Sequence, residues 1–265
     1  MARIITAIVL IPLAILAVIY ATPIYFLIGI GLIGTLCLYE YFGLMQAMGI
    51  FVQPLFGYLT FWMLLFAFRQ DRYPMGILLA LVMIAAFLSA IWRKRTVKER
   101  AFALMAELLG IFYFALFLYP AIAVRYDFGN KIGSQWTILL LAVIWAGDTF
   151  ALVAGKMFGK HPFASILSPK KTNEGAIAGL LCGIGVGAAV QHLFFADLPM
   201  LHVMVVSALL GIFGQLGDLA ESMLKRAAEI KDSSHLIPGH GGALDRMDSL
   251  LFAIPVLYFY LLQLY

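Results

Sequence analysis

Long apolar runs separated by short polar segments dominate this chain. They fall near residues 4–21, 24–42, 52–68, 75–92, 101–120, 137–155, 175–195, 199–221 and 247–264. Each run approaches the roughly 20 residues that a helix needs to cross the hydrocarbon core of a bilayer. Only 12% of the residues are charged, whereas soluble domains carry about 25%. We therefore predict an all-α, polytopic transmembrane bundle of about nine helices, broken at the junction prolines Pro23, Pro74, Pro120 and Pro199.

The lysines and arginines are distributed unevenly between these runs. If the N-terminus is cytoplasmic, 14 of the 18 basic residues fall on the cytoplasmic side. The opposite side keeps only Arg69, Arg72, Arg125 and Lys131. Because cytoplasmic segments of membrane proteins carry such an excess of positive charge, we expect a cytoplasmic N-terminus, an external C-terminus and a location in the cell (inner) membrane. Residues 1–120 are expected to form a helical scaffold, and residues 121–265 a catalytic region with cytoplasmic loops at 156–174 and 225–244.

Five carboxylates lie within the apolar runs or at their ends, namely Asp148, Asp218, Glu221, Asp245 and Asp248. A lone charge at the bilayer centre costs roughly 2.5–3.5 kcal/mol, so cations must offset these groups. At the end of the eighth run the helical spacing i, i+3, i+4 and i+7 is occupied by Asp218, Glu221, Ser222 and Lys225, which therefore share one face. Asp245 and Asp248 repeat this spacing at the start of the ninth run.

Two carboxylate-bearing faces joined by a short loop can converge on one divalent cation. Hard oxygen ligands favour Mg²⁺ over Zn²⁺. The alternative is that these acids form structural salt bridges with Lys225, Arg226 and Arg246. Two further intramembrane acids, Glu40 and Glu107, have no neighbouring motif, which leaves open whether they pack helices or contact a lipid headgroup or an ion.

The two polar loops carry groups that suit phosphate. The first contains Pro238-Gly239-His240-Gly241-Gly242, and glycine lets backbone amides approach an anion closely. The basic residues beside it, which together predict a polyphosphate cradle, are Lys225, Arg226, Lys231, His240 and Arg246. The second loop offers the donors Ser168, Lys170, Lys171 and Thr172, although Thr172 suits a helix N-cap equally well.

This pattern resembles the signature of the phosphatidate cytidylyltransferase family. The resemblance rests on the segment 222–248, on Ser168–Gly175 and on Gly147-Asp148-Thr149, and it departs from the family at Asn173 and Ala243. It implies that CTP and phosphatidate give CDP-diacylglycerol and pyrophosphate. It also implies a requirement for Mg²⁺, a monovalent cation such as K⁺ as a second ion, and a homodimer.

On this hypothesis each predicted residue has a role. The metal ligands are expected to be Asp218, Asp245, Asp248 and Asp148, and the catalytic set Asp218, Lys225, Asp245 and Asp248. Substrate contacts are expected from Ser168, Lys170, Lys171, Ser222, Arg226, Lys231, His240, Gly241, Gly242 and Arg246. Two other functions stay open, a CTP-dependent lipid kinase, which would release CDP, and a cation-coupled transporter. The expected partners are CTP, phosphatidate and membrane lipid, and no nucleic acid.

Overall fold

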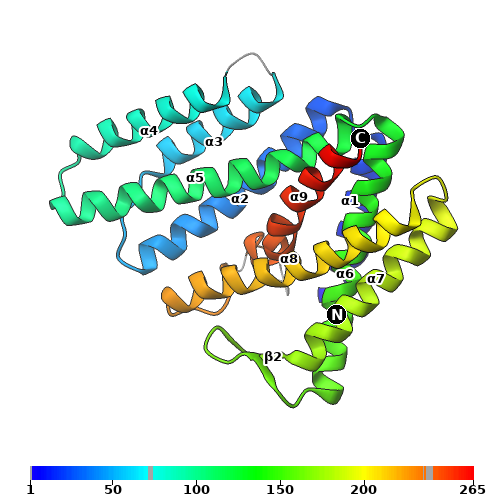
Figure 1. The fold of residues 1–265 in the computed structure, drawn as a ribbon. Coiled ribbons are helices and arrows are strands. Elements are labelled where there is room, and N and C mark those ends of the chain that lie inside the picture. Colours follow the sequence, from blue (N-terminus) through cyan, green and yellow to red (C-terminus); the bar gives the residue numbers. More distant parts are fainter. Residues whose placement is uncertain (1, 71–73, 235, 237–240) are drawn as a thin grey trace.

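The computed structural model describes residues 2–70, 74–234, 236 and 241–265, with side chains from residue 8 onward. Within this part the chain forms nine helices and one two-stranded antiparallel hairpin (Figure 1). The helices are α1 (Ala2–Tyr20), α2 (Pro23–Ala47), α3 (Pro54–Arg69), α4 (Met75–Ile91), α5 (Val97–Tyr126), α6 (Asn130–Phe158), α7 (Asn173–Phe194), α8 (Met200–Ala227) and α9 (Leu244–Leu264). The strands β1 (Pro162–Ala164) and β2 (Ser168–Thr172) join α6 to α7. Every predicted apolar run therefore lies in a helix.

Six of these helices are long and apolar enough to cross a membrane, namely α2, α5, α6, α7, α8 and α9. Three shorter apolar helices accompany them. They are α3, α4 and the part of α1 for which side chains are described (Ile8–Tyr20). The prediction of an all-helical membrane protein is confirmed. That all nine helices cross the bilayer stays a prediction.

Prolines mark most of the expected helix boundaries. Pro23 lies in the first turn of α2, and Pro74 and Pro199 immediately precede α4 and α8. The prediction for Pro120 was wrong, because this residue lies inside the 30-residue helix α5 and is buried there. Neighbouring helices and local backbone adjustments accommodate proline in membrane helices, so proline is a weaker terminator here than in a soluble protein.

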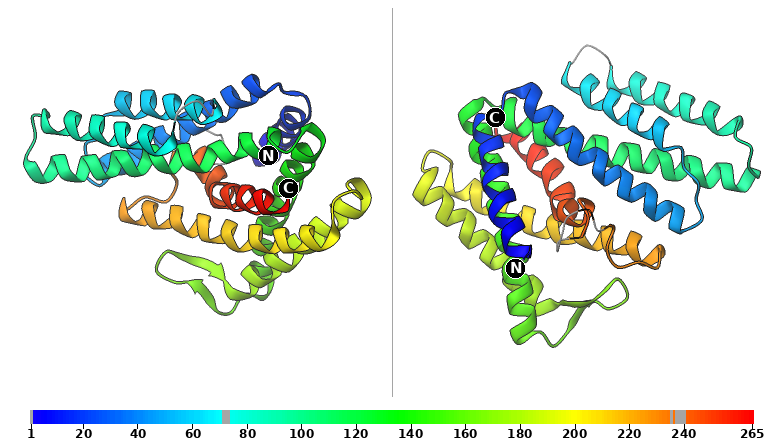
Figure 2. Two further views of the ribbon diagram at one scale, coloured as in Figure 1. Left: turned by 45° about the horizontal axis from the view of Figure 1, so that its top comes forward. Right: turned by 180° about the vertical axis from the view of Figure 1, so that it is seen from behind.

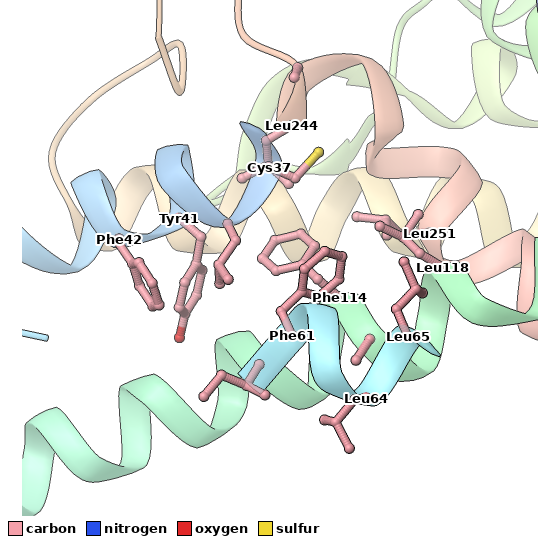
Figure 3. Packing of buried hydrophobic residues seen from close by; sticks show 14 of the residues in the cluster. Cys37, Tyr41, Phe42, Phe61, Leu64, Leu65, Phe114, Leu118, Leu244 and Leu251 are labelled. Carbon is pink, nitrogen blue, oxygen red and sulfur yellow. The ribbon is translucent and has the colours of Figure 1, made fainter. Parts of the chain in front are cut away.

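The N-terminal helices form a layer packed around one apolar core. Helices α2, α3 and α4 all contact α5, and α9 contacts α2 and α5 from within the molecule (Figure 1). Figure 3 shows Phe61 of α3, Phe114 of α5 and Leu251 of α9 converging at the centre of this core, and each is fully buried. Leu244, the first residue of α9, lies beside Cys37 of α2 in the same view. The scaffold is thus packed directly against the start of α9.

The C-terminal helices pack closely because of a glycine stripe. Every fourth residue of α7 from Gly175 to Gly187 is a buried glycine. A Cβ atom at Gly179 would collide with the backbone carbonyl of Gly147 on α6. The stripe therefore brings the backbone of α7 against α6, with which it makes its most extensive contact.

The connections gather at two ends of the molecule. The α2–α3 and α4–α5 connections, the hairpin and the start of the α8–α9 connection lie toward the lower left in Figure 1. The α5–α6 and α7–α8 turns lie with the C-terminus toward the upper right (Figure 1). Helix α1 runs alongside α6 (Figure 2). At the upper end, buried Arg125 donates to the carbonyls of Val18 and Ile19, which ties the end of α1 to α5.

Candidate functional site

The site is built at a close approach of α8 and α9. A Cβ atom at Gly217 of α8 would collide with the backbone carbonyl of Asp248 on α9 and lie 3.1 Å from Cβ of Phe252. Gly214, one turn earlier, also faces α9, where an added Cβ atom would lie in ordinary contact with Ser249 at 3.6 Å. Because these glycines let the two backbones touch, the side chains that follow them on α8 meet the first turns of α9.

Three carboxylates meet at this crossing, and we call Asp218, Glu221 and Asp248 the carboxylate cluster. One oxygen from each lies within 4.8 Å of one oxygen from each of the others. Glu221 is 1% exposed, and its Oε1 atom has no hydrogen-bond partner among the described residues. Negative charges repel strongly at these separations in a partly buried site, and Lys171 and Lys225 offset part of this repulsion through their ion pairs with Asp218 and Glu221.

Two neighbouring elements add charge to the cluster. Lys171 of β2 forms an ion pair with Asp218, and the hairpin is also held by Arg226 Nε, which donates to the carbonyl of Leu167 at 3.2 Å. Asp148 of α6 lies within electrostatic range of Asp218 and Lys171. It lines a small cavity of about 20 Å³ between α6, α7 and α8, with Gly179 and Gln215 among the other lining residues.

Asp245 lies outside the carboxylate cluster, although we predicted it as a metal ligand. Its Oδ1 atom accepts from Lys225 Nζ at 2.6 Å, and its Oδ2 atom accepts from the backbone amides of Ser233 at 3.0 Å and Gly242 at 2.8 Å. Lys225 is buried and also pairs with Glu221 at 2.8 Å. The salt-bridge alternative therefore describes Asp245 and Glu221, which both pair with Lys225, whereas Asp218 and Asp248 form no ion pair with Lys225, Arg226 or Arg246 in the described structure. Asp245 lies one turn before Asp248, and its side chain faces the preceding loop.

The structure separates the predicted substrate residues into several groups. Lys170, Lys231 and Arg246 are exposed, Ser168 is half-buried on β2, and Ser222 is buried on α8 beside Glu221. Gly241 has a left-handed backbone with φ of +80°, as expected for the glycine-rich turn. His240 lies outside the described residues. Thr172 accepts from the amide of Gly175 at 3.2 Å, so its helix-capping role is confirmed.

The two intramembrane acids left open have different partners. Glu107 of α5 accepts from the amide of Gln53 and from Arg93 Nη2 at 2.6 Å, so it ties two N-terminal connections together. Glu40 of α2 binds the segment before α9 through hydroxyl and amide donors. The cluster member Glu221 was also missing from our predicted ligands, although its i, i+3 spacing from Asp218 marks it in the sequence.

The residues present fit a divalent cation. Three carboxylates offer oxygen ligands of the kind that Mg²⁺ prefers. The Glu221 Oε1 atom is a buried acceptor without a donor in the described part of the chain, and leaving such a group unpaired is costly. A hard cation among Asp218, Glu221 and Asp248 would satisfy that oxygen and relieve the mutual repulsion. The geometry thus defines a helical membrane protein with a cluster of carboxylates and lysines at one end of the bundle.

Comparison with known proteins identifies the family. The model of the cytidylyltransferase family matches residues 1–264, and the chain belongs to this family. A phosphatidate cytidylyltransferase of Staphylococcus haemolyticus (strain JCSC1435) is 41% identical over 149 residues, which cover 55% of this chain and 56% of the relative. The enzymes of the same name from Staphylococcus aureus (strain COL) and Staphylococcus epidermidis (strain ATCC 35984) are 41% and 42% identical over 131 and 133 residues. Each of those two matches covers 49% of this chain and 50% of the relative. The chain thus spans about half the length of the curated relatives it matches.

Proposed function

We propose that this protein transfers the cytidylyl group of CTP to phosphatidate, which gives CDP-diacylglycerol and pyrophosphate. Membership of the cytidylyltransferase family and the activity named for the relatives support this reaction. The observation that carries the proposal is the carboxylate cluster beside Lys171 at one end of an apolar bundle. A site of this kind can hold a cation and a polyphosphate at the depth of a lipid headgroup.

In this reaction a phosphate oxygen of phosphatidate forms a bond to the α-phosphorus of CTP. The bond from that phosphorus to the bridging oxygen breaks, and the electron pair leaves with pyrophosphate. The attacking phosphate is already an anion near neutral pH, so the protein needs no strong general base. Phosphoryl transfer depends mainly on positioning and charge neutralisation.

Asp218, Glu221 and Asp248 are the residues that would hold Mg²⁺, with Asp148 adding negative charge nearby. When bound, Mg²⁺ supplies charge neutralisation for the phosphate oxygens. Lys171 lies at the cluster on a hairpin, where it can exchange Asp218 for a substrate phosphate. K⁺ is proposed as a second cation.

The remaining predicted residues have two proposed roles, ordering the site and contacting substrate. Lys225 and Asp245 order the base of the site rather than contact substrate directly, because their charged atoms are already paired. The exposed cations that can neutralise the triphosphate or lipid phosphate are Lys170, Arg226, Lys231 and Arg246. Ser168, Ser222, His240, Gly241 and Gly242 complete the proposed substrate contacts.

We also propose that the site faces the cytoplasm of a multi-pass cell membrane protein. The loops rich in lysine and arginine lie at the same end of the molecule (Figure 1), as the excess of positive charge on cytoplasmic segments requires. A homodimer built on the N-terminal helices is part of the proposal. Chemical labelling of single cysteines placed in the 92–96 and 127–129 connections of intact cells tests the orientation.

The decisive experiment follows two labels. Purified protein is mixed with phosphatidate, Mg²⁺ and CTP that carries a label at either the α- or the γ-phosphate. We expect the α-label in lipid and the γ-label in pyrophosphate. Transfer of the γ-label to lipid would establish the CTP-dependent lipid kinase instead, and cation flux in liposomes without nucleotide would establish a transporter.

A variant links this activity to the cluster. Asp248→Asn removes one negative charge among the proposed ligands, and we expect it to lower Mg²⁺-dependent transfer by roughly 100-fold or more. The matched control is Glu229→Gln, because Glu229 is an exposed carboxylate just after α8 and lies outside the cluster. Near-normal activity of Asp248→Asn, with folding intact, would remove this residue from the metal site.

A further inference from the structure

Glu40 of α2 is buried in the first half of the chain yet binds two points of the polar loop (residues 228–243, of which the structure describes 228–234, 236 and 241–243). Its side chain accepts from Ser234 Oγ at 2.6 Å and from the backbone amides of Ala243 and Leu244 at 2.9 and 2.8 Å. Ser233 Oγ lies 2.8 Å from Glu40 Oε2. Glu40 is 2% exposed, and no described lysine, arginine or histidine pairs with it. The carboxylate is therefore stabilised by donors from the loop.

These contacts hold the start of α9. Ala243 and Leu244 supply the first amides of that helix, and the N-cap position has no side-chain cap of its own. Unpaired amides at a helix N-terminus need an acceptor and favour a negative charge. Glu40 meets both needs from a helix about 200 residues earlier in the chain. Its role is thus that of an N-cap supplied from outside the helix.

The same loop residues connect Glu40 to the candidate site. Ser233 Oγ also lies 2.9 Å from Asp245 Oδ2, and since a hydroxyl has one proton it serves one of the two carboxylates at a time. Asp245 in turn pairs with Lys225, and Lys225 with Glu221 of the carboxylate cluster. A continuous set of contacts therefore runs from α2 to the cluster.

Gly242 gives independent evidence that this junction is tightly built. A Cβ atom there would collide with Ser233 Oγ and with Glu40 Oε2. The glycine thus meets a steric requirement of the Glu40 junction, in addition to any contact with phosphate. Leu244 packs beside Cys37, one turn before Glu40 on α2 (Figure 3), so apolar and polar contacts fix the same point.

We propose that Glu40 is a positioning residue that sets the polar loop and the first turn of α9, and through them the direction in which Asp248 faces the cation site. The inference rests on the proposed function, because it assigns Glu40 a role in that reaction. It also assigns the N-terminal helices a part in assembling the site. Glu40 itself touches neither substrate nor cation.

Two readouts separate positioning from general stability. The first is the Mg²⁺ concentration for half-maximal transfer, and the second is the rate of tryptic cleavage after the exposed Lys231 in the polar loop. In Glu40→Gln an NH₂ group replaces one carboxylate oxygen. That group donates hydrogen bonds, but the hydroxyl and backbone amide groups around residue 40 need acceptors. We expect both quantities to rise about tenfold, the factor that follows from loss of one charge-assisted hydrogen bond. Glu40→Asp, which keeps the charge, should recover part of both effects.

Glu107→Gln is the matched control. It also removes a buried carboxylate charge from the N-terminal helices, but its partners are Gln53 and Arg93. We expect lower thermal stability with both readouts within about twofold of wild type, since this site does not contact the polar loop. Equal changes in the two variants would show that Glu40 acts only through overall stability.

A milder variant keeps the test decisive if Glu40→Gln does not fold. Ser234→Ala removes one donor to Glu40 and leaves the carboxylate and Asp245 in place, so it should shift both readouts in the same directions. Unchanged readouts in Glu40→Gln, or in Ser234→Ala if the former is misfolded, would overturn the inference. If wild-type protein transfers no label to lipid, the proposed function fails, and tryptic cleavage alone still decides the role of Glu40.

Discussion

Lys225 is the buried cation that joins two carboxylates, and its removal is the sharpest test of how this site is held together. Its Nζ atom lies 2.8 Å from Glu221 and 2.6 Å from Asp245. The side chain of Lys225 is 11% exposed, and those of Glu221 and Asp245 are 1% and 6% exposed. The substitution Lys225→Met keeps most of the side-chain volume and removes the charge. It leaves Glu221, a member of the carboxylate cluster, and the neighbouring Asp245 without the buried cation that joins them.

The expected magnitude follows from these distances. At an effective dielectric constant of about 20, each contact contributes about 6 kcal/mol of Coulomb attraction. Desolvation of the three charged groups offsets much of this attraction, so the measured loss is smaller. Removing one partner of a buried ion pair costs about 3–5 kcal/mol. For a chain of this size that loss lowers the Tm by roughly 6–20 °C.

The assay is thermal unfolding of purified protein in detergent, measured with and without Mg²⁺. We expect Lys225→Met to be strongly destabilised without Mg²⁺ and to gain more stability from Mg²⁺ than wild type gains. The reason is that a divalent cation in the carboxylate cluster partly replaces the lost positive charge, and a ligand at about 100 times its Kd adds about 2.7 kcal/mol.

Lys231→Met is the matched control, because Lys231 is an exposed lysine in the polar loop with no ion pair among the described residues. It should change the Tm by less than about 2 °C. A Tm for Lys225→Met within that same margin, or an equal response of variant and wild type to Mg²⁺, would refute the reasoning that Lys225 balances buried acids.

Two further predictions concern other parts of the molecule. Gly217→Ala places a methyl group against the carbonyl of Asp248, so it should cost roughly 1–3 kcal/mol in thermal unfolding. Gly185→Ala, where open space surrounds the glycine, should be neutral or slightly stabilising, and equal losses would contradict the close α8–α9 crossing. In the α7–α8 turn, hydrogen bonds from Lys131 and Gln135 lower the pKa of Asp197. Its small contribution to stability is therefore present above the unfolded pKa of about 4 and is lost as pH falls through the lower folded pKa. Lys131→Ala should raise the pKa of Asp197 and weaken this acid dependence, as measured by unfolding between pH 2 and 6 (roughly the span around that pKa), whereas Lys94→Ala should leave it unchanged.

The helices could be predicted from the sequence because each one depends on a local property, a continuous run of apolar residues. A run of about 20 apolar residues can satisfy its backbone in a bilayer only as a helix, and all nine runs are helical in the described structure. The same local reasoning failed at Pro120, where contacts from other helices decide whether a proline ends α5. Local spacing likewise allowed Thr172 either to cap α7 or to contact phosphate, and the structure shows the cap.

What the sequence by itself determined is which residues share a face of one helix, such as Asp218 with Glu221 on α8. It does not determine how two helices are rotated and spaced relative to each other. The close contact at Gly217 sets the crossing at which Asp248 joins the cluster while Asp245 faces Lys225. Glu40 is the extreme case, because its partners lie about 200 residues away, and only the packing of α2 against α9 brings its carboxylate to their amides.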